Sequence, residues 1–290
     1  MTNKADIDEL ISKLRSHDVS EHYDAYTSLL KPEIRTKLKD SELQSLINVF
    51  ENGSEPSFVR SSAATVLGHT GDERTINWLV KPIIDDLDGK AVDAAVLRNA
   101  AVALGMIAQS MIQRTDTSLS DWSDTQASIN HVVGKLCQSL GVRTVEYRSG
   151  SLFRYFDLNK VGHDVEKASS DLTKAVCANI SYRIGLLCAI KMIGDVGPVV
   201  DTLAYIFTAD PIRDDITILD EAIDALASCA VSAFYWNEKA TGFQRGFSET
   251  GYAIKTLQSV EAMPEMYWQV RESARKALKF IEGGQKQQRE

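Results

Sequence analysis

A ten-residue pattern recurs along this chain and constrains its fold more than any other feature. Residues 59–68 read Val-Arg-Ser-Ser-Ala-Ala-Thr-Val-Leu-Gly, and Gly71 and Asp72 follow shortly after. Similar segments begin at residues 96, 182, 218 and 270, and a degenerate copy begins at residue 132. A period of about 36 to 43 residues is typical of stacked helix pairs, because one pair has too little apolar surface to close its own core. The repeat therefore predicts a helical solenoid.

Apolar side chains at helical spacing predict an all-α fold. One stripe consists of Leu43, Leu46, Ile47 and Phe50, and Ser41 with Gln44 predicts a capping box in front of it. Pro82 falls inside a helix that the pattern predicts over residues 72–87, where a proline would cause a kink. Alanine and glycine at repeated positions would let neighbouring helices approach closely.

The repeated pattern resembles the HEAT-repeat family, and more narrowly its short bacterial-type variant found in phycobilin lyases. The resemblance is carried by V-R-x-x-A-A-x-x-L-G-x-x-G-D at 59–72 and by its copies. It implies a single α-solenoid over residues 1–290, made of about six to seven helical hairpins. Residues 1–40 would form N-terminal capping helices, and residues 284–290 a frayed tail. An arginine at the position of Arg60, Arg183 and Arg271 often binds a neighbouring acid or a helix-end carbonyl in this family, which implies structural roles here.

Two intervals between the repeats are longer than the others. The spacings are 37, 36, 50, 36 and 52 residues, and the excess falls at 142–163 and 237–250. In the first segment, β-branched and aromatic residues flank Ser149-Gly150, which predicts a short β-hairpin. The second segment is rich in aromatic residues and glycine.

These two segments are the predicted partner-binding sites. Tyrosine, tryptophan and arginine dominate binding hot spots, because they offer a large contact area with a polar end. The candidates are Tyr147, Arg148, Arg154 and Tyr155 at the first segment and Trp236, Phe243 and Arg245 at the second. The alternative is that the aromatic side chains fold back and close a small core of the segment itself.

Composition narrows the class of function. The chain has 32 basic and 40 acidic residues and a net charge of −8, which argues against a nucleic-acid-binding protein. The N-terminal sequence lacks an apolar signal region, so we expect a cytoplasmic protein without membrane contact. The acidic clusters, Asp214-Asp215 among them, are interpreted as solvated surface or as a face for a basic partner.

Local motifs for catalysis are absent from the sequence. His17 and His22 are five residues apart, which directs the two rings to different faces of a helix, and the four cysteines form no C-x-x-C pair. We therefore predict no catalytic residues, no metal and no cofactor. The predicted function is a non-catalytic protein–protein interaction scaffold or adaptor. Two alternatives stay open: an enzyme or enzyme subunit similar to the bilin lyases, and an acidic inhibitor or immunity-type protein that covers a basic target.

Overall fold

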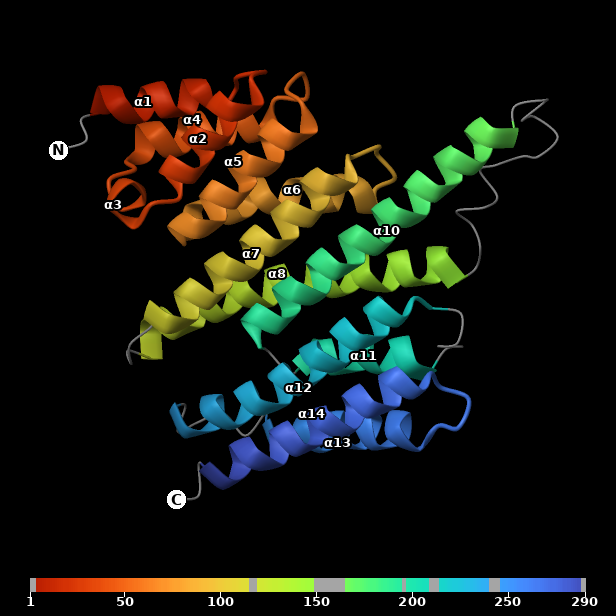
Figure 1. Cartoon of the computed structure of the whole chain (residues 1–290). Helices are drawn as coiled ribbons and strands as arrows, with labels where there is room; N and C mark the ends of the chain where they lie inside the picture. Colours follow the sequence, from red (N-terminus) through yellow and green to blue (C-terminus); the bar gives the residue numbers. More distant parts are fainter. Residues whose placement is uncertain are drawn as a thin grey trace. The chain divides into compact units, whose positions relative to one another are not determined.

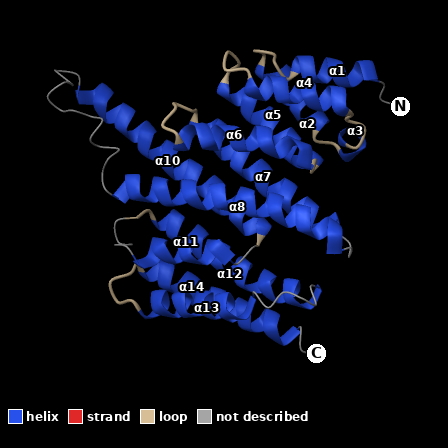
Figure 2. Cartoon of the chain, turned by 180° about the vertical axis from the view of Figure 1, so that it is seen from behind, coloured by secondary structure: helices blue, strands red, loops and turns tan. Residues whose placement is uncertain are grey.

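The fold is all-α, as the sequence predicts. The computed structural model describes residues 4–114, 119–148, 165–194, 197–208, 214–239 and 246–287, and these ranges contain helices and connecting loops but no strand (Figure 2). The chain divides into two compact units, Met1–Lys135 and Leu136–Glu290. The division falls within one long helix, α8 (Leu119–Arg148).

Unit 1 consists of paired helices. Its elements are α1 (Lys4–Lys13), α2 (Val19–Leu29), α3 (Pro32–Arg35), α4 (Asp40–Glu51), α5 (Ser57–Thr70), η1 (Glu73–Thr75), α6 (Ile76–Leu87), α7 (Ala94–Arg114) and the first part of α8. Helix α1 packs on α2, α4 on α5 and α6 on α7, while α5 and α7 lie side by side (Figure 1). The predicted stripe of α4 is buried, since Leu46 and Phe50 are at most 1% exposed.

Glycines at two repeated positions permit this packing. A Cβ atom on Gly68 would lie 2.6 Å from the Cα atom of Ala103, so α5 and α7 approach more closely than a larger residue at position 68 would allow. Gly71 ends α5 with a φ of 64°, and Gly194 follows α10 with a φ of 66°. Only glycine adopts this left-handed conformation at little cost, which explains why the pattern ends in a glycine.

Unit 2 has the same kind of packing. It contains the rest of α8, α10 (Val165–Ile193), α11 (Gly197–Thr208), α12 (Ile216–Lys239), α13 (Gly246–Ala262) and α14 (Trp268–Gln287). Helix α11 packs on α12 and α13 on α14, while α12 also contacts α10 and α14 (Figure 1). Fully buried apolar residues from each helix form its core, among them Leu186, Leu203, Leu226 and Val270.

The predicted β-hairpin is wrong where the structure can test it. Residues 142–148 belong to α8, which continues to Arg148. Thr144 is fully buried, and its hydroxyl donates to the carbonyl of Leu140, one turn earlier. Leu136, Leu140 and Thr144 thus follow a helical period, and burial of that face outweighs the strand preference of β-branched residues. Residues 149–163 of this segment lie outside the described residues.

The second predicted insertion and the predicted tail are also largely helical. Helix α12 continues to Lys239 and α13 begins at Gly246, so only residues 240–245 of the segment 237–250 lie outside the described residues. Helix α14 continues to Gln287, so residues 284–287 of the predicted tail have a helical backbone. Much of the extra length between repeats is therefore helix, since α8 has 30 residues and α10 has 29.

The start of α4 differs from the predicted capping box. The helix begins at Asp40, and the carboxylate of Glu42 accepts the backbone N–H of Lys39 at 3.0 Å and the hydroxyl of Ser41 at 2.9 Å. Gln44 instead donates to Asn48. A glutamate two residues into the helix satisfies the free N–H group better than the predicted glutamine, which lies too far along the helix. Pro82 lies inside α6, as predicted.

Two described helices are long and apolar enough to cross a membrane by length and composition alone. They span Ala94–Arg114 and Thr173–Ile193, and 56% and 50% of their most apolar windows are buried inside the protein. Helix α7, the first of these, packs against α5 and α6. Burial of this kind is what the core helices of a soluble protein show.

Candidate functional site

A fully buried ion pair lies in unit 2. Arg183 comes from α10, and Asp214 lies just before α12. The two guanidinium nitrogens Nη1 and Nη2 donate to the two carboxylate oxygens at 2.8 and 2.7 Å, and both side chains are 0% exposed. Such a parallel, two-bond arrangement is the strongest geometry available to this pair of residues. The sequence interpretation of Asp214 as a solvated surface residue is wrong. Its side chain is fully buried, and the positive charge of Arg183 offsets the cost of burying the carboxylate.

Tyr147 covers the guanidinium group of Arg183. The ring centre of Tyr147 lies 5.4 Å from the Cζ atom of Arg183, a cation–π distance. Burial raises the pKa of the Tyr147 hydroxyl, the carboxylates of Asp215 and Asp214 raise it further, and Arg183 acts in the opposite direction. The phenol is therefore neutral at physiological pH. We call Tyr147, Arg183, Asp214 and Asp215 the Arg183 cluster.

Further hydrogen bonds tie α8 to α10 beside this cluster. Asn179 lies one turn before Arg183 and donates to the carbonyl of Arg143 at 3.4 Å. The buried hydroxyls of Ser139 and Tyr182 are 2.9 Å apart. These contacts fix the C-terminal turns of α8 against α10. The cluster thus holds the last turn of α8 in place immediately before residues 149–164.

The arginine at the equivalent position of unit 1 has a different partner. Arg60 donates from Nε to the carbonyl of Phe50 at 2.8 Å, near the C-terminal end of α4. That contact satisfies a carbonyl that has no partner within its own helix. Arg60 and Arg183 therefore have the two roles that the resemblance implies, a carbonyl partner and an acidic partner. For Arg271, the Nε atom is buried without a hydrogen-bond partner.

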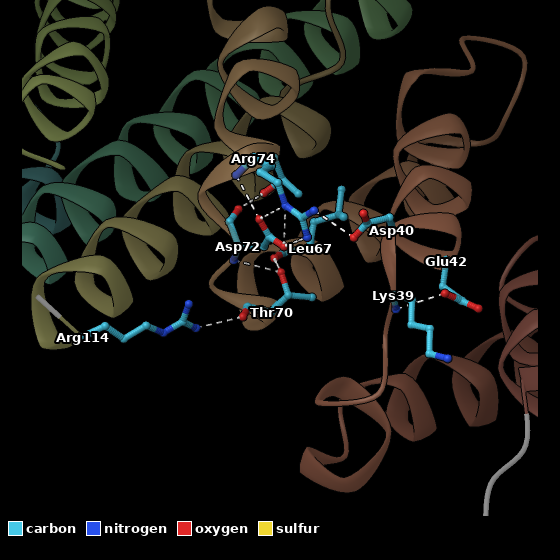
Figure 3. A network of polar contacts seen from close by, with 9 residues as sticks. Lys39, Asp40, Glu42, Leu67, Thr70, Asp72, Arg74 and Arg114 are labelled. Atoms are coloured by element: carbon cyan, nitrogen blue, oxygen red, sulfur yellow. Dashed lines mark hydrogen bonds and ion pairs between the residues drawn. The ribbon is translucent and has the colours of Figure 1, made fainter. Parts of the chain in front are cut away.

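A polar network joins the helix ends of unit 1 (Figure 3). Asp72 caps η1 by accepting the backbone N–H of Arg74, and the Arg74 side chain binds Asp72 at 2.6 Å and Asp40 at 2.8 Å. Arg114 donates to the carbonyl of Thr70 at 3.2 Å. Bonding to Arg74 lowers the pKa of the Asp72 carboxyl. The network links α4, α5 and α7 through ion pairs and hydrogen bonds, so its role is structural.

Histidines and acids do not gather into a metal site in the described ranges, where no group of three or more histidine, cysteine, aspartate or glutamate side chains could hold an ion. His22 is buried and binds the carbonyl of Leu14 through Nδ1 at 2.6 Å and the Ser62 hydroxyl through Nε2 at 3.0 Å. Since a carbonyl can only accept, Nδ1 carries the proton. Both ring nitrogens are thus used to connect α1, α2 and α5.

The structure locates three of the seven predicted binding residues. Tyr147 is partly buried against Arg183, at the end of α8. Arg148 is the last residue of α8 and Trp236 lies in α12, but only their backbone is described. The remaining four residues, Arg154, Tyr155, Phe243 and Arg245, lie outside the described residues.

The sequence interpretation missed a set of exposed aromatic residues on helix surfaces. Their exposed fractions range from 42% for Tyr205 to 67% for Trp268, and the set also contains Tyr23, Phe58, Tyr252 and Phe280. The sequence could have predicted the exposure of Trp268 and Phe280, because their positions do not follow the helical spacing of the buried stripe of α14. That stripe consists of Val270, Ala274, Ala277 and Ile281.

Comparisons with known proteins give no family for this chain. No family model matches it, and no curated protein matches its sequence. Among solved structures it is similar to human deoxyhypusine hydroxylase in complex with glycerol, at 14% identity over 96% of each chain and a TM-score of 0.31. A similarity of this size carries no conclusion about activity.

Proposed function

We propose that this chain is a non-catalytic protein-binding scaffold, built as a HEAT-like α-solenoid. Its binding surface comprises the end of α8 with the segment that follows it and the end of α12 with the segment that follows it. Tyr147, Arg148, Arg154 and Tyr155 belong to the first, and Trp236, Phe243 and Arg245 to the second. The partner is another protein, and the net charge of −8 suits one whose basic surface meets acidic side chains of this chain rather than these arginines. The proposed location is the cytoplasm.

One observation carries this proposal: the Arg183 cluster fixes the helix turn from which the first segment departs. Functional residues commonly lie on loops that a rigid scaffold holds in position. Tyr147 is half-buried over an ion pair whose side chains are fully buried, so the end of α8 cannot shift without losing the contact between the Tyr147 ring and the Arg183 guanidinium. A fixed starting point reduces the conformational entropy that a binding segment loses in a complex.

The pairing of polar side chains with groups of their own unit also supports a scaffold. Arg60, Arg183, Asp72 and His22 each bind a group of the same unit. Polar groups that already satisfy one another are poorly suited to donate or accept protons from a substrate. The enzyme alternative makes a different prediction, a change in visible absorbance when the chain is mixed with a bilin and an acceptor protein.

Affinity capture tests the proposal directly. Wild-type chain and the variant Arg148→Ala/Arg154→Ala/Tyr155→Ala would be used as bait in lysate from the source cells, with bound proteins measured by quantitative mass spectrometry. We expect a partner that wild type retains and the variant loses, with equal helicity of both baits by circular dichroism.

A control variant separates loss of this site from a general effect of substituting surface residues. Lys90 and Asp85 form an exposed ion pair in unit 1, remote in sequence from both segments. Lys90→Ala/Asp85→Ala should capture the same partner as wild type. Equal capture by all three baits would mean that the segment after α8 does not bind, and the proposal would then fail.

A further inference from the structure

A half-buried arginine in unit 1 has a neutral side chain as its partner. Arg35 is the last residue of α3, and its Nη1 atom lies 3.2 Å from Nδ1 of His69, near the end of α5. A guanidinium group can only donate, so Nδ1 accepts and carries no proton. Burial lowers the pKa of His69 and the charge of Arg35 lowers it further, so the ring is neutral at physiological pH. The contact with His69 therefore does not compensate the positive charge of Arg35.

Most donor groups of Arg35 are available for a ligand. Its guanidinium group has five N–H groups. Within the described ranges, the contact with His69 is its one side-chain hydrogen bond, and it forms no ion pair there. Its other nitrogen atoms are not enclosed, so their N–H groups reach solvent. By contrast, Arg15, Arg74 and Arg183 each bind a carboxylate of this chain.

Further positive charges lie beside Arg35 in the chain. Segment 31–39 has four basic residues, Lys31, Arg35, Lys37 and Lys39, and one acidic residue, Glu33. The three lysines are exposed, and none of them forms an ion pair with another described residue. The backbone N–H of Arg35 donates to the carbonyl of Lys31, so these two residues lie one helical turn apart on one side of α3. Glu33 is two positions from Arg35 and therefore does not share that side.

The helices around His69 bring few acidic side chains to this place. Helices α5 and α7 contain no acidic residue, and α2 contains none after Asp24. At the start of α4, Asp40 binds Arg74, and Glu42 is buried and bonded to backbone and hydroxyl groups. Asp72, which follows α5, also binds Arg74 (Figure 3). The surface around Arg35 is therefore basic within an acidic protein.

We propose that Lys31, Arg35 and His69 bind a phosphate group carried by a side chain of a partner protein. We call these three residues the Arg35 site. A phosphate monoester carries a charge of about −1.5 to −2 at pH 7 and three acceptor oxygens. This group suits two cations that lie one turn apart and the free N–H groups of Arg35 better than a single carboxylate does. The neutral ring of His69 offers its Nε2–H as a further donor.

The surroundings of the Arg35 site favour a phosphorylated segment of chain over a free phosphate ion. Lys37 and Lys39 are exposed next to the site in the sequence, where they can pair with acidic residues on either side of a phosphorylated residue. The partner proposed for the segments of unit 2 presents a basic surface, which this basic surface repels. The Arg35 site therefore binds a different molecule, and it does not depend on the binding surface proposed above.

Nuclear magnetic resonance of the histidine rings tests the site in the full chain. The chain has five histidines, and the variant His69→Gln identifies the His69 signal. The probe is a short peptide with phosphoserine between two glutamates. It should shift the His69 signal to saturation and raise the pKa of His69, because the bound dianion offsets the charge of Arg35. The same peptide with unmodified serine, and inorganic phosphate, should each bind on the order of tenfold more weakly.

Substitutions assign the effect to the site. Arg35→Gln should weaken binding of the phosphopeptide on the order of tenfold, and Lys31→Gln several-fold. Lys31 is exposed, so its variant tests the site without a risk to folding, and circular dichroism verifies the fold of both variants. A matched control, Arg98→Gln, removes the same charge from an exposed arginine on α7 of the same unit and should bind like wild type.

Four results would overturn the proposal. An unchanged His69 signal at phosphopeptide concentrations up to about 10 mM would exclude binding at this site. Equal affinity for the unmodified peptide would show that the phosphate is not recognised, and equal affinity for inorganic phosphate would assign the site to the free ion. Equal weakening in Arg98→Gln would show a general effect of charge.

Discussion

Breaking the Arg183–Asp214 pair should destabilise unit 2 more than any exposed substitution. Asp214→Asn keeps the shape of the side chain and removes its charge, while Arg183→Met removes the cation with little change in volume. Because both side chains are 0% exposed, either change leaves one buried charge without its partner. Loss of one member of such a pair costs about 3–5 kcal/mol.

The double variant gives the sharper result. Arg183→Met/Asp214→Asn leaves no uncompensated charge, so its loss of stability should be well below the sum of the two single losses. A coupling energy of about 2 kcal/mol or more is expected for groups in direct contact. Urea unfolding followed by far-ultraviolet circular dichroism measures all three variants, with two transitions fitted because the chain has two compact units.

The chain offers a matched control in an exposed ion pair that also starts from α10. Lys191 on α10 and Asp224 on α12 form an ion pair at 2.9 Å, but their side chains are 40% and 61% exposed. Lys191→Met and Asp224→Asn should each cost less than about 1 kcal/mol. A cost of under about 1 kcal/mol for Arg183→Met, or simple additivity in the double variant, would refute the reasoning from burial.

Three further predictions follow from local contacts. Gly68→Ala should lower the free energy of unfolding by about 1–3 kcal/mol, because its new Cβ atom clashes with Ala103, and Ala103→Gly should restore part of this loss. Gly134→Ala on α8, where the added Cβ atom meets open space, should raise the free energy of unfolding by up to about 1 kcal/mol in the same urea assay. Equal effects at both glycines would contradict the close packing at Gly68. The raised pKa of the Tyr147 hydroxyl stabilises the fold at pH values below the ordinary tyrosine pKa of about 10, and this contribution is lost as the pH rises through the folded-state pKa. Wild type should therefore lose more stability than Tyr147→Phe as the pH is raised above about 10, and parallel profiles would exclude the effect. The lowered pKa of the Asp72 carboxyl stabilises the fold above about pH 4, and this contribution is lost as the pH falls through the folded-state pKa. In urea unfolding at decreasing pH, the difference in stability between wild type and Asp72→Asn should therefore shrink. A difference that grows as the pH falls would contradict this prediction.

The helical class and much of the core follow from the sequence alone. The stripe of α4 and the buried residues of α14 were identifiable because apolar side chains recur at helical spacing. The close approach at Gly68 was implied by the alanine and glycine residues at repeated positions. Local spacing determines these features, so a single sequence suffices to predict them.

The hairpin prediction failed because local preference competed with burial. Val142, Thr144 and Val145 favour strands in isolation, but Thr144 is buried one turn after Leu140 within a continuous helix. The partner of Arg183 also escaped prediction. Asp214 is 31 residues away, and no spacing rule indicates which acid a buried arginine will meet. Contacts of this kind depend on packing in three dimensions.

Hydrogen–deuterium exchange of the chain with and without its captured partner tests the proposed binding surface most directly. Slower exchange is expected in peptides that cover residues 147–164 and 236–245, while α4, α5 and α7 should exchange as they do in the free chain. Slower exchange confined to unit 1, or no change in either segment while the partner is bound, would contradict the account.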